Sequence, residues 1–74
     1  MPTLPKLSGK ELLKILKSIE FKVTRIKGSH HILKHKDARM TVVPVHSNEK
    51  IGPGLLIKIL NDCKITKEDF IKFF

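Results

Sequence analysis

Three β-forming segments follow one another near the middle of the chain, and the connections between them are short. The segments are residues 21–26, 30–35 and 40–45, all rich in β-branched and other strand-forming side chains. Gly28-Ser29 joins the first two, and residues 36–39 join the last two. A parallel pair would need a crossover of a dozen residues or more. The three segments are therefore predicted to fold through hairpins into one antiparallel sheet.

Helical patterns flank these strands. Ser8 and Glu11 fit a capping box, and the apolar residues after them recur at the spacing of one helix face: Leu12, Ile15, Leu16 and Ile19. Pro53 suits the first turn of a second helix, whose expected buried stripe is Leu55, Leu56, Ile59 and Leu60. A short third helix is expected after Thr66. The predicted fold class is α+β, in the order α-β-β-β-α of double-stranded-RNA-binding domains. It has a three-stranded antiparallel sheet with helices on one face, plus a short C-terminal helix.

The length of the chain limits where chemistry can take place. Its 74 residues are expected to form one domain, residues 1–74. A chain this short buries only about 60% of its unfolded surface, so a functional site must lie on an open surface. Cys63 is the only cysteine, which excludes an internal disulfide and a cysteine-based zinc site. We expect it to be a small core residue.

Positive charge is concentrated in the predicted sheet. The chain has fifteen Lys and Arg against seven Asp and Glu, a net charge of +8. Six basic residues and a single acidic one, Asp37, fall between Lys22 and Arg39. Such a patch indicates a polyanionic partner, and the low aromatic content, 5% of the chain, counts against a sheet that stacks RNA bases. The sequence has no membrane-spanning apolar run and no signal-peptide core. It therefore predicts a cytoplasmic protein with no membrane partner.

Histidines and lysines cluster where the second strand is expected to begin. Residues 27–35 read Lys-Gly-Ser-His-His-Ile-Leu-Lys-His and contain three of the four histidines. Histidine can change its charge near neutral pH, and lysine binds anions. This combination is suited to holding a phosphate and moving a proton beside it. The fourth histidine, His46, is expected in a loop.

Strand alternation limits how many of these histidines can act together. In a regular strand one face carries His30, Ile32 and Lys34, and the other carries His31, Leu33 and His35. His30 and Lys34 could then serve one site. His31 and His35 are four residues apart, about 13 Å along a strand, which is too far for one metal ion. No metal site is predicted.

Several short motifs occur in a characteristic order along the chain. They are residues 25–31 (Arg-Ile-Lys-Gly-Ser-His-His), 43–46 (Val-Pro-Val-His), 51–55 (Ile-Gly-Pro-Gly-Leu) and 59–60 (Ile-Leu). Together they resemble the HicA toxin family over about residues 10–74. The resemblance implies a fold like that of double-stranded-RNA-binding domains and a ribosome-independent mRNA interferase activity. It also implies a cognate HicB-like antitoxin as protein partner, and it maps the family's catalytic histidine to His30.

This resemblance and the basic patch together suggest a mechanism. His30 would act as general base on the 2′-OH of mRNA, with no metal and no small-molecule cofactor, leaving a 2′,3′-cyclic phosphate and a 5′-OH. The expected phosphate ligands are Lys27, Lys34, Arg25 and Arg39. Ser29 could orient the imidazole or the phosphate. The proton for the leaving 5′-oxygen could come from His31, His35, Lys34 or water.

Other roles are compatible with the same residues. The chain could be a non-catalytic module that binds double-stranded RNA by shape and 2′-OH contacts. Its basic surface could meet an acidic protein. His30 could also be a structural polar residue at a strand start, with its hydrogen bonds made to the backbone. Only the catalytic hypothesis requires an imidazole after Gly28-Ser29.

Overall fold

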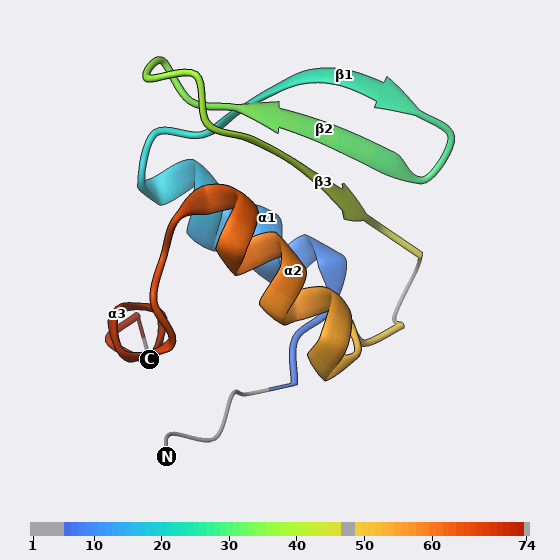
Figure 1. Cartoon of the computed structure of the whole chain (residues 1–74). Coiled ribbons are helices and arrows are strands. Elements are labelled where there is room, and N and C mark those ends of the chain that lie inside the picture. The colour runs from blue at the N-terminus through green and yellow to red at the C-terminus, as the bar shows by residue number, and fades with distance from the viewer. Residues whose placement is uncertain (1–5, 47–48, 74) are drawn as a thin grey trace.

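The sheet and the helices form two layers (Figure 1). The computed structural model describes residues 6–46 and 49–73. The elements in chain order are α1 (Gly9–Ser18), β1 (Lys22–Lys27), β2 (His30–Lys34), β3 (Met40–Pro44), α2 (Pro53–Cys63) and α3 (Lys67–Ile71). The strands are antiparallel in the order β1-β2-β3, and α1 and α2 lie on one face of the sheet. The predicted α-β-β-β-α order with a short C-terminal helix is confirmed.

The first helix begins at the predicted capping box. The backbone N–H of Ser8 donates to Glu11 Oε1 at 3.0 Å, and the N–H of Glu11 donates to Ser8 Oγ at 3.2 Å. These two bonds satisfy groups that a helix N-terminus otherwise leaves unpaired. Leu12 and Leu16 of the predicted stripe are fully buried. Ile15 is partly buried and packs against the edge of the core.

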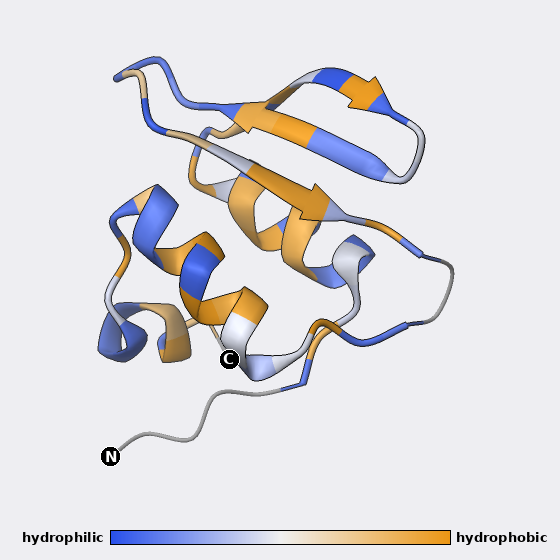
Figure 2. Cartoon of the chain, turned by 45° about the vertical axis from the view of Figure 1, so that its right-hand side comes forward, coloured by the Kyte–Doolittle hydropathy of each residue, from blue (hydrophilic) through white to orange (hydrophobic). Residues whose placement is uncertain are grey.

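One cluster of apolar side chains fills the space between the layers. Figure 2 shows hydrophobic residues in both the strands and the helices. Its largest fully buried members are Phe21, Phe70, Leu12, Leu16, Leu33, Leu56, Ile59, Leu60, Val43 and Cys63. Burial raises the pKa of the Cys63 thiol to about 11, as expected for an inert core residue. Leu55 was predicted to be buried, but it is 38% exposed. The buried stripe of α2 is centred on Leu56, Ile59 and Leu60, and Leu55 flanks it in the first turn.

The third strand is an edge strand and tolerates a proline at its end. The carbonyl of Ser29 accepts from the N–H of Val45 at 2.7 Å, and the carbonyl of Arg39 accepts from the N–H of His35 at 2.8 Å. Hydrogen-bonded pairs alternate along an antiparallel ladder, so the pair His30–Pro44 between them is a non-bonded one. The N–H that Pro44 lacks would point away from β2. The strand therefore loses no ladder bond.

The end of β3 is packed closely against the start of α1. A Cβ on Gly9 would overlap the carbonyl oxygen of Pro44, so only glycine fits there. The segment that follows β3 returns to the same place, because the N–H of Ile51 donates to the carbonyl of Leu7 at 2.6 Å. Lys50 forms an isolated bridge with Ser8. Val45 before His46 and Ile51 after it are thus both hydrogen-bonded to other parts of the fold.

Candidate nucleic-acid interface

The outer face of the sheet, opposite the helices, carries the side chains of alternate β2 residues. His30 and Lys34 are exposed there, and Leu33 is fully buried on the helix-facing side. The strand therefore has the alternation expected from the sequence. It places His30 and Lys34 on the same face, about 13 Å apart along the strand. We call this face, with the β1 and β3 residues that pair with its members, the open face.

A β-bulge in β1 adds cations to the open face. Lys22 pairs with Lys34, but after a register shift between Val23 and Arg25 the next outward pair is Arg25–Ile32, followed by Lys27–His30. If β1 had no bulge and Thr24 were paired in regular alternation, Arg25 and Lys27 would face the helices. The bulge thus brings both cations alongside His30.

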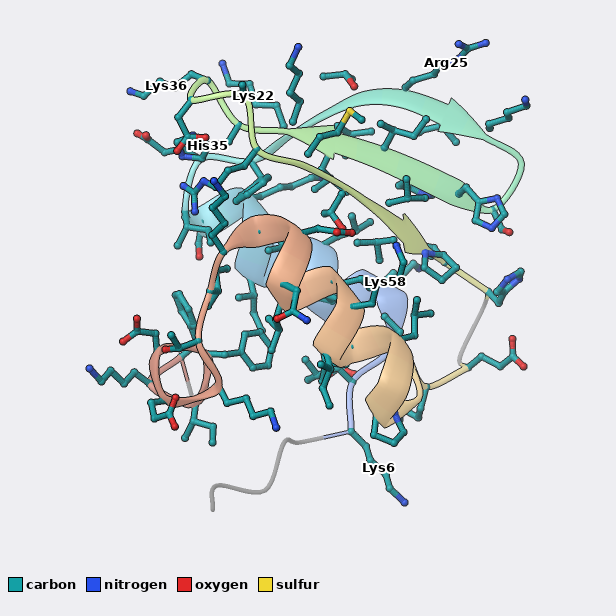
Figure 3. The ribbon with its side chains drawn as sticks, in the orientation of Figure 1. Lys6, Lys22, Arg25, His35, Lys36 and Lys58 are labelled. Atoms are coloured by element: carbon teal, nitrogen blue, oxygen red, sulfur yellow. The ribbon has the colours of Figure 1, made fainter. Side chains whose placement is uncertain are left out.

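The open face carries four cations besides His30. They are Lys22, Arg25, Lys27 and Lys34. Within residues 6–46 and 49–73 none of them forms an ion pair. Figure 3 shows Lys22 and Arg25 on the sheet and Lys58 on α2, in the other layer. Unpaired cations on one surface create the positive potential that attracts a polyanion.

Arg39, another expected phosphate ligand, has different partners. Its guanidinium pairs with Asp37 at 2.8 Å, donates to the carbonyl of Cys63 at 2.7 Å and lies 5.2 Å from the ring centroid of Phe21. These contacts join the β2–β3 connection to the C-terminus of α2, where a cation is favourable. The same guanidinium lowers the pKa of the Asp37 carboxyl. The structure therefore gives Arg39 partners within the fold.

Two of the histidines in the cluster face away from His30. His31 is half-buried, and its Nδ1 lies 3.3 Å from the carbonyl oxygen of Ser29. The side chain of His35 is only 11% exposed, and its ring packs edge-on against Phe21 with 5.1 Å between ring centroids. Neither side chain shares the open face, so His31 and His35 lie on the wrong side of the sheet to donate a proton beside His30.

The fourth histidine lies next to the Gly28-Ser29 turn. Nε2 of His46 is 3.4 Å from Oγ of Ser29, although the two residues are seventeen apart in sequence. The serine expected to orient an imidazole thus contacts His46 rather than His30. Sequence reasoning assigned His46 to a loop. The position of His46 beside Ser29 could have been predicted by continuing the pairing of the β2–β3 hairpin beyond Pro44.

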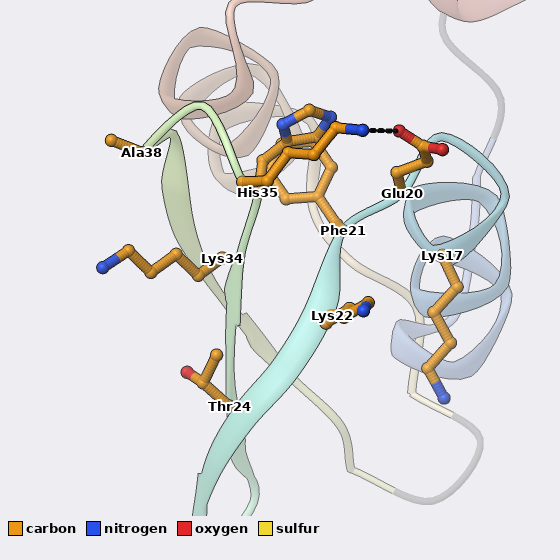
Figure 4. A pocket seen from close by; sticks show the side chains of 9 residues that line it. Lys17, Glu20, Phe21, Lys22, Thr24, Lys34, His35 and Ala38 are labelled. Carbon is orange, nitrogen blue, oxygen red and sulfur yellow. Dashed lines mark ion pairs between the residues drawn. The ribbon is translucent and has the colours of Figure 1, made fainter.

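A shallow cleft lies at the other end of β2 from His30 (Figure 4). It has a volume of about 610 Å³ and is lined by Lys17, Glu20, Phe21, Lys22, Thr24, Lys34, His35, Lys36 and Ala38. Glu20 pairs with Lys36 at 3.4 Å. Lys22 and Lys34 belong to both the cleft and the open face. The basic surface therefore continues from His30 along the sheet into this cleft.

Two other kinds of site can be considered for the described residues. Within residues 6–46 and 49–73 no three His, Cys, Asp or Glu side chains are grouped so that they could hold a metal ion. In the same part of the chain, no helix is both long enough and apolar enough to cross a bilayer. Neither finding bears on what the open face binds.

Comparison with known protein families identifies a match. The model of a family described as the HicA toxin of bacterial toxin–antitoxin systems matches residues 9–65. These residues extend from the start of α1 to just beyond α2 and include the whole sheet. No curated protein matches the chain.

Proposed function

Because the chain belongs to the HicA toxin family of bacterial toxin–antitoxin systems, we propose that it is an endoribonuclease that cleaves mRNA. The family is known for mRNA interferases. In this proposal the open face binds the RNA backbone, and His30 is the general base. Cleavage requires neither the ribosome nor a metal ion.

The position of His30 among unpaired cations carries the proposal. His30 is exposed at the start of β2, directly opposite Lys27 on β1. Gly28, with φ of 62°, and Ser29 form the tight turn that joins these two residues. An imidazole and an ammonium group thus extend from directly paired positions of one hairpin. A structural histidine would not need this exposure.

RNA supplies its own nucleophile, which explains how so small a site can be sufficient. Neutral His30 takes the proton from a 2′-OH as that oxygen attacks the adjacent phosphorus. Lys27 and Arg25 stabilise the negative charge that develops on the phosphorane oxygens. Lys34, farther along the strand, binds a neighbouring phosphate. The products are a 2′,3′-cyclic phosphate and a 5′-OH.

Membership of this family implies an antitoxin as protein partner. We assign its docking to the open face, where it would cover His30. Among the cations this face also exposes Met40 and Val42, at 55% and 40%. Apolar side chains next to unpaired charges suit a partner surface that combines acidic and apolar residues. The free toxin and the complex should therefore differ in activity.

The direct test compares wild type with His30→Ala on an RNA substrate in excess EDTA, with analysis of the product ends. Wild type is expected to leave cyclic phosphates, and His30→Ala to be slower by a factor on the order of 10²–10⁴. His30 is exposed, so the variant should fold, and circular dichroism checks this. Salt-sensitive RNA binding by both proteins with cleavage by neither would contradict the proposal. It would favour the non-catalytic RNA-binding module.

A further inference from the structure

Cleavage of RNA needs a second proton transfer, and His30 performs only the first. When the bond between phosphorus and the 5′-oxygen breaks, the departing alkoxide must gain a proton. His31 and His35 face the helix layer, and Lys34 is about 13 Å from His30 along β2. These positions leave water, Lys27 or a side chain from another element as the proton donor.

The hairpin ladder carries His46 to the same end of the sheet as His30. His30 pairs with Pro44, and the bond from Val45 N–H to the Ser29 carbonyl extends the ladder by one further pair. His46 follows directly, diagonal to His30 and two residues beyond its partner. Diagonal neighbours in an antiparallel pair lie about 7–8 Å apart. That separation leaves room for one phosphate between two imidazoles.

The contacts of His46 leave one ring nitrogen available. Nε2 lies 3.4 Å from the hydroxyl of Ser29, which places the ring beside the turn that carries His30. Within the described residues Nδ1 has no hydrogen-bond partner, and the residue is exposed. In the imidazolium form both nitrogens carry protons. Nε2–H can then donate to Ser29 while Nδ1–H faces solvent or substrate.

A small cleft adjoins His46 on the side away from β2. Its volume is about 220 Å³, and its lining consists of Pro44, His46, Glu49, Lys50, Ile51, Gly52 and Leu55. The charged groups there are Glu49 and Lys50, and Lys50 is paired with Glu11 at 3.3 Å. The nucleotide that leaves with the 5′-oxygen can lie in this cleft.

We infer that His46 is the general acid of the reaction, held in place by Ser29. The inference rests on the proposed function. His30 takes the 2′-OH proton as the oxygen–phosphorus bond forms, and imidazolium His46 gives a proton to the 5′-oxygen as its bond to phosphorus breaks. The cycle ends with His30 protonated and His46 neutral. Proton exchange with water then restores both, so no other reactant is needed.

A substrate with a sulfur atom in place of the leaving 5′-oxygen tests this role, because a thiolate departs without being protonated. On ordinary RNA, His46→Ala is expected to be slower than wild type by a factor on the order of 10²–10⁴. On the sulfur-bridged RNA it should cleave at close to the wild-type rate. His30→Ala should remain impaired on both substrates, since the 2′-OH still needs a base.

Two further readouts separate a proton donor from a residue that only shapes the loop. Wild type should show a bell-shaped dependence of rate on pH, and His46→Ala should lose the fall at high pH. Ser29→Ala should cause a smaller loss that the sulfur-bridged substrate also reverses. The inference would be overturned if His46→Ala were equally slow on both substrates. It would also be overturned if His46→Ala cleaved ordinary RNA as fast as wild type does. A wild-type protein inert on both would refute the proposed function itself, and this inference with it.

Discussion

Two arginines of the basic stretch differ in their contacts within the folded chain. Arg25 lies on the open face opposite Ile32 and has no ion-pair partner within residues 6–46 and 49–73. Arg39 is half-buried against Asp37, Phe21 and the carbonyl of Cys63. In the sequence both are basic residues near the histidine cluster, because the contacts of Arg39 come from elements far away along the chain. The sequence therefore could not distinguish an exposed cation on the open face from one with partners within the fold.

Replacement of Arg39 should affect stability rather than RNA binding. Arg39→Ala removes a charged hydrogen bond and a cation–π contact, and should lower the free energy of unfolding by about 1–3 kcal/mol. Denaturant unfolding measures this loss. At a temperature where the variant is folded, its affinity for RNA should equal that of wild type. A large loss of affinity with unchanged stability would show that Arg39 binds phosphate after all.

Local sequence patterns predicted the helices and strands well. They could not predict the tertiary contacts that complete the candidate interface. The capping box of α1, the two hairpins and the Thr66 cap of α3 were all legible, because each depends on residues close in sequence. The bulge at Thr24 could not be predicted in this way, because it depends on how β1 pairs with β2. Plain alternation in β1 would have placed Arg25 beside Val23, on the helix-facing side. Only the register with β2 turns it outward.

The cap of α1 should make the stability of the fold depend on pH. The pKa of Glu11 is lowered chiefly by the backbone N–H of Ser8, with further contributions from the Ser8 hydroxyl and from Lys50. A group whose pKa is lower in the folded state stabilises the fold above its ordinary pKa of 4.5. This contribution is lost as the pH falls below that value.

The contribution of Glu11 can be tested by measuring melting temperatures between pH 3 and pH 6. This is roughly the range in which carboxylates titrate. The melting temperature of wild type should fall as the pH drops through the lower part of that range. Glu11→Gln keeps a side chain that can complete the cap but cannot titrate there, so its melting temperature should fall less steeply. Equal slopes for the two proteins would contradict the assignment.

At the scale of the whole molecule, the two sides of the sheet differ: one packs against the helices and the other carries charged side chains. The apolar cluster lies between the helices and one side of the sheet, and the other side carries the cations of the open face. In the proposed function these four cations, which form no ion pair within residues 6–46 and 49–73, act together on one polyanion. Lys58 on α2, which pairs with Asp62 at 3.6 Å, lies away from that surface.

This division predicts which lysines control RNA affinity. If four cations contact phosphates of single-stranded RNA, the logarithm of the affinity should fall against the logarithm of salt concentration with a slope of about −3. Lys34→Gln should make that slope shallower by about 0.7. Lys58→Gln, which makes the same charge change on α2, should leave it unchanged. Equal effects of the two substitutions would show that binding depends on net charge alone.

In the proposed mechanism the open face cleaves RNA through the 2′-OH of the substrate, with His30 as its base. The first measurement to make compares an RNA oligonucleotide that has a single 2′-deoxy nucleotide at the mapped cleavage site with the all-RNA parent, in excess EDTA. The parent should be cut, and the substituted strand should bind with similar affinity but stay intact at that site. Cleavage of the 2′-deoxy strand at the same position would rule out this mechanism, because the nucleophile would then have to be something other than the 2′-OH of the RNA.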